Sequence, residues 1–338
     1  MILMSTRSIK ILGLALGTVF LVALGLVVFW PVPPPPPLPN PNGYDDFLTA
    51  DRLVVGDTLN LYDVKDDELK TIVEQNRAAL QAVRQGLTKE CRMPLTNDAQ
   101  YLSQETQHLI QLRRLAFQLI GEGKLAEIEG RRADAVQSYL DTIRFGQEIG
   151  RGGLMIEKLA GISCEGFGLR ALKRLAPRLT PEASRSLTRA LAALEGRREP
   201  WEAGLRRQKA FNRRMGNFLD VTIAQLLLQP MLRESDRKFR EQAKTAEARL
   251  RLLMTDLAIR QFQSGRGVYP NRLVELVPQF LQSLPRDPFG TNGFIYRPQT
   301  NGFLLYSVGP DGKDDGGTPI AARGQSGDIP SSTLGLQP

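Results

Sequence analysis

The sequence is poor in the two residue types that build most zinc and nucleophile sites. Its 338 residues include one histidine, His108, and two cysteines, Cys91 and Cys164, without Cys-x-x-Cys spacing. A zinc site of four Cys and His ligands is therefore not expected. A Ser-His or Cys-His triad has little support, because His108 has no such partners beside it on its expected helix. The two cysteines leave a disulfide and two separate thiols both open.

Charged residues are absent from residues 11–30, an apolar run of about 20 residues that as a helix matches the ~30 Å hydrocarbon core of a membrane. Arg7 and Lys10 precede the run, and the next Lys or Arg is Arg52, which orients the amino terminus inward. The run is longer than the apolar part of a cleaved signal peptide and ends without a small-x-small site. We therefore expect a cytoplasmic tail at 1–10, a transmembrane helix at 11–30 and a single-pass cell-membrane protein with extracytoplasmic bulk.

Proline then dominates residues 31–42, which predicts an extended polyproline II spacer. Residues 43–245 are expected to form an all-α domain, because apolar residues recur at helical spacing from Asp66 onward. Thr180 and Pro181 form a typical helix start, with a capping side chain and a proline in the first turn. Two further helices are predicted at about 201–228 and 235–263.

A helical hairpin is predicted between Gly121 and Ile149. Gly123, Ala135 and Tyr139 have a small–small–aromatic spacing that resembles one tetratricopeptide repeat, in which small residues let two helices approach and the aromatic ring fills the gap. No second copy follows at a 34-residue period, and such arrays need about three repeats. The prediction is therefore one repeat-like hairpin within an all-α domain, and that domain is expected to bind a protein partner in the cell envelope.

Positive charge is in moderate excess, with 44 Lys and Arg against 36 Asp and Glu. Basic residues concentrate between 197 and 214, where Glu195, Glu199 and Glu202 dilute them. The favoured interpretation is a solvated helix face, and contact with anionic lipid or a cell-wall polymer is the alternative. No nucleic-acid partner is expected, because the predicted topology places this stretch outside the cytoplasm.

The segment 246–330 has a different pattern, a long helix followed by two short alternating runs typical of a β-hairpin. Its motifs are Tyr269-Pro270, Leu-Pro-x-Asp-Pro-Phe-Gly ending at Gly290, Gly-Pro-Asp-Gly at 309–312, and Asp328-Ile329. In this order they resemble the carboxyl-terminal domain of the major pseudopilin of type II secretion. The fold class that we predict is thus α+β, mainly α, with a small antiparallel sheet, and a flexible tail at 331–338.

The resemblance implies a calcium site in the last loop. The aspartates that match the family pattern are Asp311 and Asp328, and Asp314 or Asp315 can add oxygen ligands. Calcium takes about 6–8 oxygen ligands, and glycine-rich loops let carbonyls turn inward. A solvated acidic turn is the alternative. An EF-hand does not fit, because the third and twelfth loop positions counted from Asp311 are Lys313 and Ala322.

The amino-terminal run departs from the pseudopilin pattern, since it has no Gly-Phe-Thr-Leu junction and no glutamate. The sequence therefore favours a non-enzymatic, membrane-anchored interaction protein of the cell envelope. The first alternative is an envelope hydrolase that uses carboxylate pairs such as Glu127 with Glu129 or Asp134 with Asp141. The second is an accessory protein of type II secretion or pilus assembly.

Overall fold

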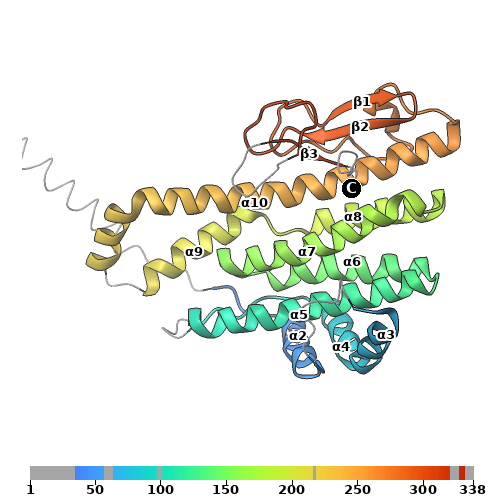
Figure 1. Ribbon diagram of the computed structural model, residues 1–338. Coiled ribbons are helices and arrows are strands. Elements are labelled where there is room, and N and C mark those ends of the chain that lie inside the picture. Colours follow the sequence, from blue (N-terminus) through green and yellow to red (C-terminus); the bar gives the residue numbers. More distant parts are fainter. Residues whose placement is uncertain (1–34, 57–63, 97–100, 216–217, 320–326, 332–338) are drawn as a thin grey trace, which may run out of the picture.

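The computed structural model describes residues 35–56, 64–96, 101–215, 218–319 and 327–331. In these ranges the protein is mainly helical and carries one three-stranded antiparallel sheet at one side of the helices (Figure 1). The helices are α2 (Gly43–Arg52), α3 (Asp66–Gln75), α4 (Arg77–Leu87), α5 (Tyr101–Ile128), α6 (Arg132–Ile149), α7 (Met155–Leu175), α8 (Pro181–Arg197), α9 (Trp201–Met215) and α10 (Phe218–Arg266). Two 3₁₀ turns, η1 (Ala176–Arg178) and η2 (Leu273–Leu276), and the strands β1 (Ile295–Gln299), β2 (Gly302–Ser307) and β3 (Ile329–Pro330) complete the list.

The predicted membrane architecture is corrected by the structure. Over the described ranges, every helix is too short or too polar to cross a membrane. Even α10, at 49 residues, carries closely spaced charges from Arg233 onward. The cytoplasmic tail predicted at 1–10 and the span predicted at 11–30 lie outside the described residues. The fold class is therefore a mainly helical protein with a small sheet, and the single-pass membrane localisation has no support in it.

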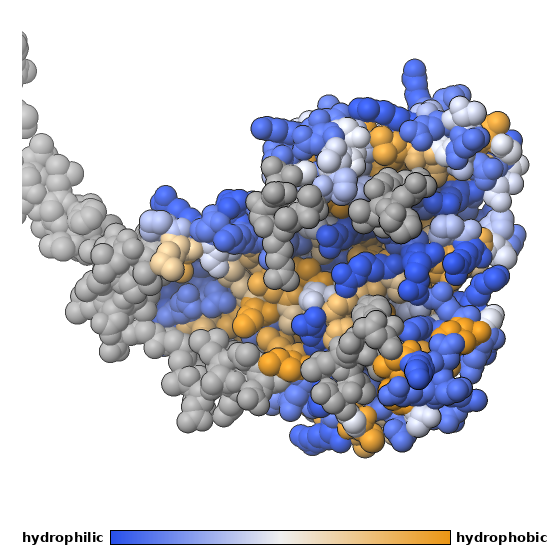
Figure 2. Space-filling view, in the orientation of Figure 1, coloured by the Kyte–Doolittle hydropathy of each residue, from blue (hydrophilic) through white to orange (hydrophobic). Residues whose placement is uncertain are grey.

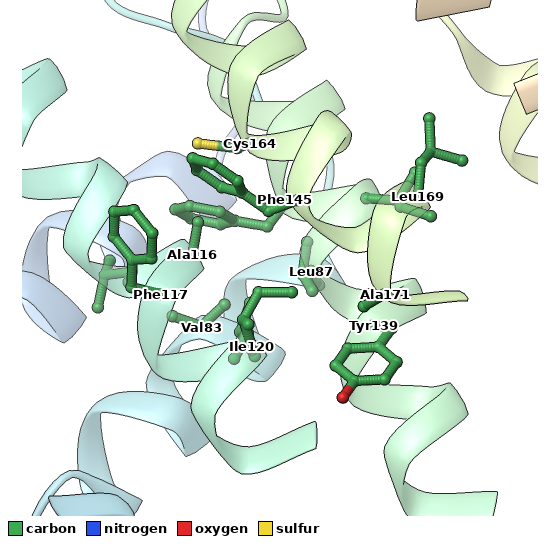
Figure 3. Packing of buried hydrophobic residues seen from close by; sticks show 14 of the residues in the cluster. Val83, Leu87, Ala116, Phe117, Ile120, Tyr139, Phe145, Cys164, Leu169 and Ala171 are labelled. Carbon is green, nitrogen blue, oxygen red and sulfur yellow. The ribbon is translucent and has the colours of Figure 1, made fainter. Parts of the chain in front are cut away.

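The main hydrophobic core joins α2 to α8 with one face of α10. Figure 3 shows side chains from separate helices meeting in it, among them Val83 of α4, Ile120 of α5 and Phe145 of α6. Close packing of this kind stabilises the fold mainly by removing apolar surface from water. Figure 2 shows that the outer surface is largely hydrophilic, with some apolar residues visible in the middle of this face.

Glycines bring α6 and α7 into backbone contact. A Cβ added to Gly146 would lie 2.5 Å from the carbonyl oxygen of Gly161, and one added to Gly168 would lie 2.6 Å from the carbonyl oxygen of Tyr139. Real Cβ atoms do not approach so closely, so larger residues at these positions would push the helices apart. This contact fixes the position of α7, and α7 forms one wall of each of two surface clefts described below.

The predicted helical hairpin forms from α5 and α6. Gly123 lies directly under the ring of Tyr139, and both Ala135 and Tyr139 are fully buried. The Tyr139 hydroxyl donates to Oε1 of Glu127 at 2.5 Å. The contact expected from the spacing is therefore present, while the relation to tetratricopeptide repeats stays a prediction.

Other helix boundaries follow the sequence in part. Thr180 caps α8 as predicted, its hydroxyl oxygen accepting from the Ala183 N–H at 3.2 Å. The helix break predicted between 228 and 235 is wrong, because α10 continues through Pro230, which costs the helix one hydrogen bond but does not end it. After Pro270 the apolar stretch forms only the short 3₁₀ turn η2, since Pro278 restricts the residue before it.

The predicted β-hairpin is confirmed, and it packs on α10. β1 and β2 pair antiparallel with Ile295 opposite Tyr306, and β3 adds to the other edge of β2 with Ile329 opposite Ser307. A second hydrophobic cluster lies between this sheet and α10. Since α10 also contributes to the main core, it runs without a break through the predicted domain boundary at 245–246.

Candidate functional site

The segment after β2 returns to the sheet through Asp328, the predicted site residue that is most deeply buried. Its side chain is fully buried, and its Oδ2 accepts from the Gly317 N–H at 2.6 Å. The Asp328 N–H donates to the Thr318 carbonyl oxygen at 2.9 Å. Its Oδ1 is buried without a hydrogen-bond partner among the described residues. A buried carboxylate oxygen of this kind carries an energetic cost unless a cation or donor reaches it.

The electrostatic surroundings of Asp328 also disfavour its ionised carboxylate. Burial raises the pKa of its carboxyl group, and the negative charges of Asp314 and Asp315 raise it further, against hydrogen bonds from the backbone N–H groups of Gly317 and Asp315. The structure thus brings three of the four predicted aspartates into one electrostatic group. Bringing carboxylates together without a cation is unfavourable, and a bound divalent cation reverses that balance.

Asp314 is held in place by neighbouring donors. Its Oδ1 accepts from the Tyr306 hydroxyl at 2.6 Å and the Gly316 N–H at 2.9 Å, and its Oδ2 pairs with Arg297 at 3.2 Å. The Tyr306 hydrogen bond lowers the pKa of Asp314. Burial, together with the bond to Asp314, raises the pKa of Tyr306 to about 12. Asp314 is therefore ionised and fixed on the sheet.

Asp311 lies apart from this group. It is exposed, its Oδ1 accepts from the Lys313 N–H at 3.2 Å, and its charge is not among those acting most strongly on Asp328. Within the described ranges no cluster of three or more His, Cys, Asp or Glu side chains is placed to hold a metal ion. A cation at Asp328 would thus need backbone carbonyls or water as additional ligands, which calcium accepts.

A second buried aspartate in the same module is fully satisfied. Asp287 accepts from the Ser307 hydroxyl at 2.8 Å and the Phe289 N–H at 2.9 Å with one oxygen, and from the Val308 N–H at 3.1 Å with the other. It ties the Asp-Pro-Phe-Gly turn to the end of β2. Asp287 is therefore a structural residue, a role that the sequence motif did not reveal.

A cleft of about 310 Å³ lies between α6, α7, α10 and the segment that joins α8 to α9. We call it the charged cleft. Glu165, almost fully buried, pairs with Arg198 at 2.5 Å, and Glu199 pairs with Lys158 at 2.6 Å and with Arg207 at 2.7 Å. The two most buried acids of this cleft, Glu165 and Glu199, are thus each paired with a basic side chain.

The pKa shifts in the charged cleft follow from burial and pairing. Burial raises the pKa of Glu165, against the charge of Arg198, and burial lowers the pKa of Lys158. For Glu199, burial is outweighed by hydrogen bonds and charge from Arg207 and Lys158, which lower its pKa to about 2. Sequence reasoning missed this network, because its members are spread over more than 40 positions.

The carboxylate pairs named for a hydrolase lie in ion pairs instead. Glu127 binds Arg174 at 2.6 Å as well as Tyr139. Glu129 and Asp134 both pair with Arg131 on the exposed turn before α6. Asp141 accepts from Arg84 at 2.9 Å and from Gln137 at 2.8 Å. Their charges are accounted for by these partners.

The remaining candidates from the sequence are the two cysteines and the histidine. Cys91 and Cys164 are free and buried, so the disulfide left open by the sequence is not formed. Burial raises the pKa of both thiols to about 12, which leaves them uncharged and unreactive near neutral pH. His108 lies exposed on α5.

No protein-family model matches this chain, and neither a curated protein nor a solved structure is similar to it. The resemblance to pseudopilins therefore rests on the motifs alone.

Proposed function

We propose that this protein is a non-enzymatic interaction protein whose carboxyl-terminal sheet module binds calcium beside Asp328. In this proposal the helical part forms the scaffold that a protein partner contacts. The calcium ion fastens the segment that carries β3 to the turn after β2. Support comes from the buried aspartate and its two acidic neighbours, and from the resemblance, which implies a calcium loop at the same place.

The observation that carries the proposal is the unpartnered Oδ1 of Asp328. Calcium prefers oxygen ligands and accepts carboxylates, backbone carbonyls and water at about 2.3–2.6 Å. Gly316 and Gly317, with φ of 71° and 89°, give the chain a turn that other residues adopt only with strain. Such a turn can direct carbonyl oxygens towards the Asp328 carboxylate.

The charge pairing in the helical part supports the non-enzymatic half of the proposal. A general acid or base must be free to exchange a proton with a substrate. Glu165 instead accepts two hydrogen bonds from the guanidinium of Arg198, at 3.0 and 2.5 Å. This bidentate pair links α7 to the end of α8.

Thermal unfolding of the full chain in calcium and in chelator, at matched ionic strength, tests the proposal. We expect calcium at 100 times its dissociation constant to stabilise the protein by about 2.7 kcal/mol. Asp328→Asn should abolish that increase, because the amide is a poorer ligand and carries no charge. Asp311→Ala should reduce it less, since Asp311 lies apart from Asp328.

Asp67→Asn is the matched control, because Asp67 is an exposed aspartate on α3 whose carboxylate makes no hydrogen bond or ion pair within the described structure. It should keep the full calcium response. An unchanged unfolding midpoint in calcium, or an equal response in Asp328→Asn, would contradict the calcium site.

A further inference from the structure

A second groove, of about 670 Å³, lies between α7, α10 and residues 327–331. We call it the basic groove. The arrangement in Figure 1 explains its position, since the strand β3 lies over α10, on the side of the sheet module that faces the helices. Its volume is in the range of about 300–1,000 Å³ typical of sites for small organic ligands.

Positive charge exceeds negative charge on the walls of the basic groove. The acids are Asp256 and Asp328, and the bases are Arg170, Lys173, Arg174, Arg249 and Arg260. Arg260 is paired with Asp256 at 2.7 Å, and Arg174 with Glu127 at 2.6 Å. Arg170, Lys173 and Arg249 form no ion pair with a carboxylate in the part of the chain that the structure describes.

The three unpaired cations act on one another. Arg170 and Arg249 are both solvent-exposed. Partial desolvation by its neighbours in the groove lowers the pKa of Arg249, and the positive charge of Arg170 lowers it further. Burial likewise lowers the pKa of Lys173, with the charge of Arg249 acting in the same direction and the charge of Asp256 acting against both. The contacts of Arg170 and Lys173 are with neutral groups, since Arg170 stacks 5.2 Å from the Phe167 ring centre and Lys173 donates to the Pro330 carbonyl at 3.1 Å. Like charges held together in this way are stabilised by an anion.

The floor of the same groove is apolar. Leu252, Leu253 and Ile329 are each exposed by 4% or less and lie among its lining residues. Pro177, Pro319 and Pro330 add further apolar surface at its edges. A ligand that matches both features has an anionic group at one end and an apolar body at the other.

We propose that the basic groove binds a small organic anion, with a carboxylate or phosphate between Arg170 and Arg249 and an apolar body against Leu252 and Leu253. Arginine suits this role because its planar guanidinium forms paired hydrogen bonds with both oxyanions. The groove shares Asp328 with the proposed calcium site, but its anion-binding side chains, Arg170 and Arg249, are not calcium ligands. The proposal therefore stands whether or not calcium binds.

Calorimetric titration of the full chain with octanoate, octyl phosphate, 1-octanol and inorganic phosphate tests this proposal in chelator. Octanoate or octyl phosphate should bind, and the tighter of the two identifies the head group. 1-Octanol has the apolar body without the charge, and inorganic phosphate has the charge without the body. Each should bind at least about tenfold more weakly, because each lacks one half of the interaction.

A charge-matched pair of variants makes the test specific. Arg170→Gln/Arg249→Gln should weaken binding of the alkyl anion by about tenfold or more, the loss expected for charge-assisted hydrogen bonds. Arg185→Gln/Arg189→Gln removes the same charge from two exposed positions on α8 and should leave the affinity unchanged. Asp328→Asn removes one of the two negative charges on the wall of the groove, so it should not weaken anion binding.

Several results would overturn the proposal. One is that 1-octanol binds as tightly as the alkyl anions. Another is that the two double variants lose the same affinity, and a third is that neither alkyl anion binds. Binding of an acidic peptide to the groove without binding of alkyl anions would assign the surface to a protein partner instead.

Discussion

The charged cleft and the basic groove share α7 and α10 as walls, yet their charges are arranged in opposite ways. In the charged cleft, Lys158 and Glu165 of α7 each face a partner of opposite charge. Nearer the carboxyl end of α7, Arg170 and Lys173 lie near Arg249, with Asp256 the acid that acts on Lys173. Both surfaces are rich in ionisable residues, so composition does not separate them. The two surfaces differ in whether their charged side chains have partners of opposite charge. Paired charges hold the helices together in the charged cleft, whereas we propose that the unpaired charges of the basic groove bind a ligand.

The two buried aspartates of the sheet module repeat this contrast. Asp287 has hydrogen-bond donors on both oxygens, while one oxygen of Asp328 has none in the described structure. Satisfied polar groups stabilise a fold, and an unsatisfied buried carboxylate oxygen is a place where an ion or water molecule can bind. The predictions below test this distinction residue by residue.

The largest effect is expected in the charged cleft. Glu165→Ala leaves the partly buried Arg198 without its carboxylate and should lower the free energy of unfolding by about 3 kcal/mol. Chemical denaturation measures the change. A loss below about 1 kcal/mol, as for an exposed pair, would mean that Glu165 is not a structural residue.

The second-largest effect is expected for Asp287→Asn. The asparagine amide would place an N–H group against the backbone N–H groups that now donate to Asp287. We therefore expect the free energy of unfolding to fall by about 2 kcal/mol, equally in calcium and in chelator. Chemical denaturation under both conditions gives the comparison. A calcium-dependent loss would place Asp287 in the metal site and would remove the contrast with Asp328.

The pH dependence of Asp328 should have a definite sign. Its folded-state pKa is raised above the unfolded value, so the protonated form favours folding. In chelator, its contribution is fully present below the unfolded pKa and is lost as pH rises through the folded pKa. The difference in unfolding free energy between wild type and Asp328→Asn should therefore shift against the wild type as pH rises. The opposite slope would show that the carboxylate is already compensated.

The smallest effect is expected at Arg249. In the absence of ligand, Arg249→Gln relieves repulsion from Arg170 and should change the free energy of unfolding by no more than about 0.5 kcal/mol, in the stabilising direction. Arg185→Gln serves as the exposed reference. A loss above 1 kcal/mol would identify Arg249 as a structural residue and would argue against an open anion site.

Local patterns in the sequence predicted the local structure well. The cap at Thr180, the contact of Gly123 with Tyr139 and the β-hairpin all depend on residues close together in the chain. The membrane-spanning architecture was inferred from hydropathy alone, and no described helix supports it. The continuity of α10 through Pro230 was missed because tertiary packing overrides a single proline.

The candidate sites were only partly predictable. The acidic loop was visible in the sequence, but the burial of Asp328 and the exposure of Asp311 depend on how the chain returns to β2. The basic groove combines residues near 170 with residues near 249, and their proximity exists only in the folded protein. Unpaired charges cannot be recognised before their neighbours are known.

Terbium luminescence tests the central claim most directly, because Tb³⁺ replaces Ca²⁺ at oxygen sites and accepts energy from a nearby tyrosine ring. The Tyr306 hydroxyl donates to Asp314, one of the carboxylates that act on Asp328. We predict a saturable signal on excitation of tyrosine that calcium displaces, that Asp328→Asn abolishes and that Asp287→Asn retains. Absence of a signal, or an equal signal in Asp328→Asn, would contradict the account.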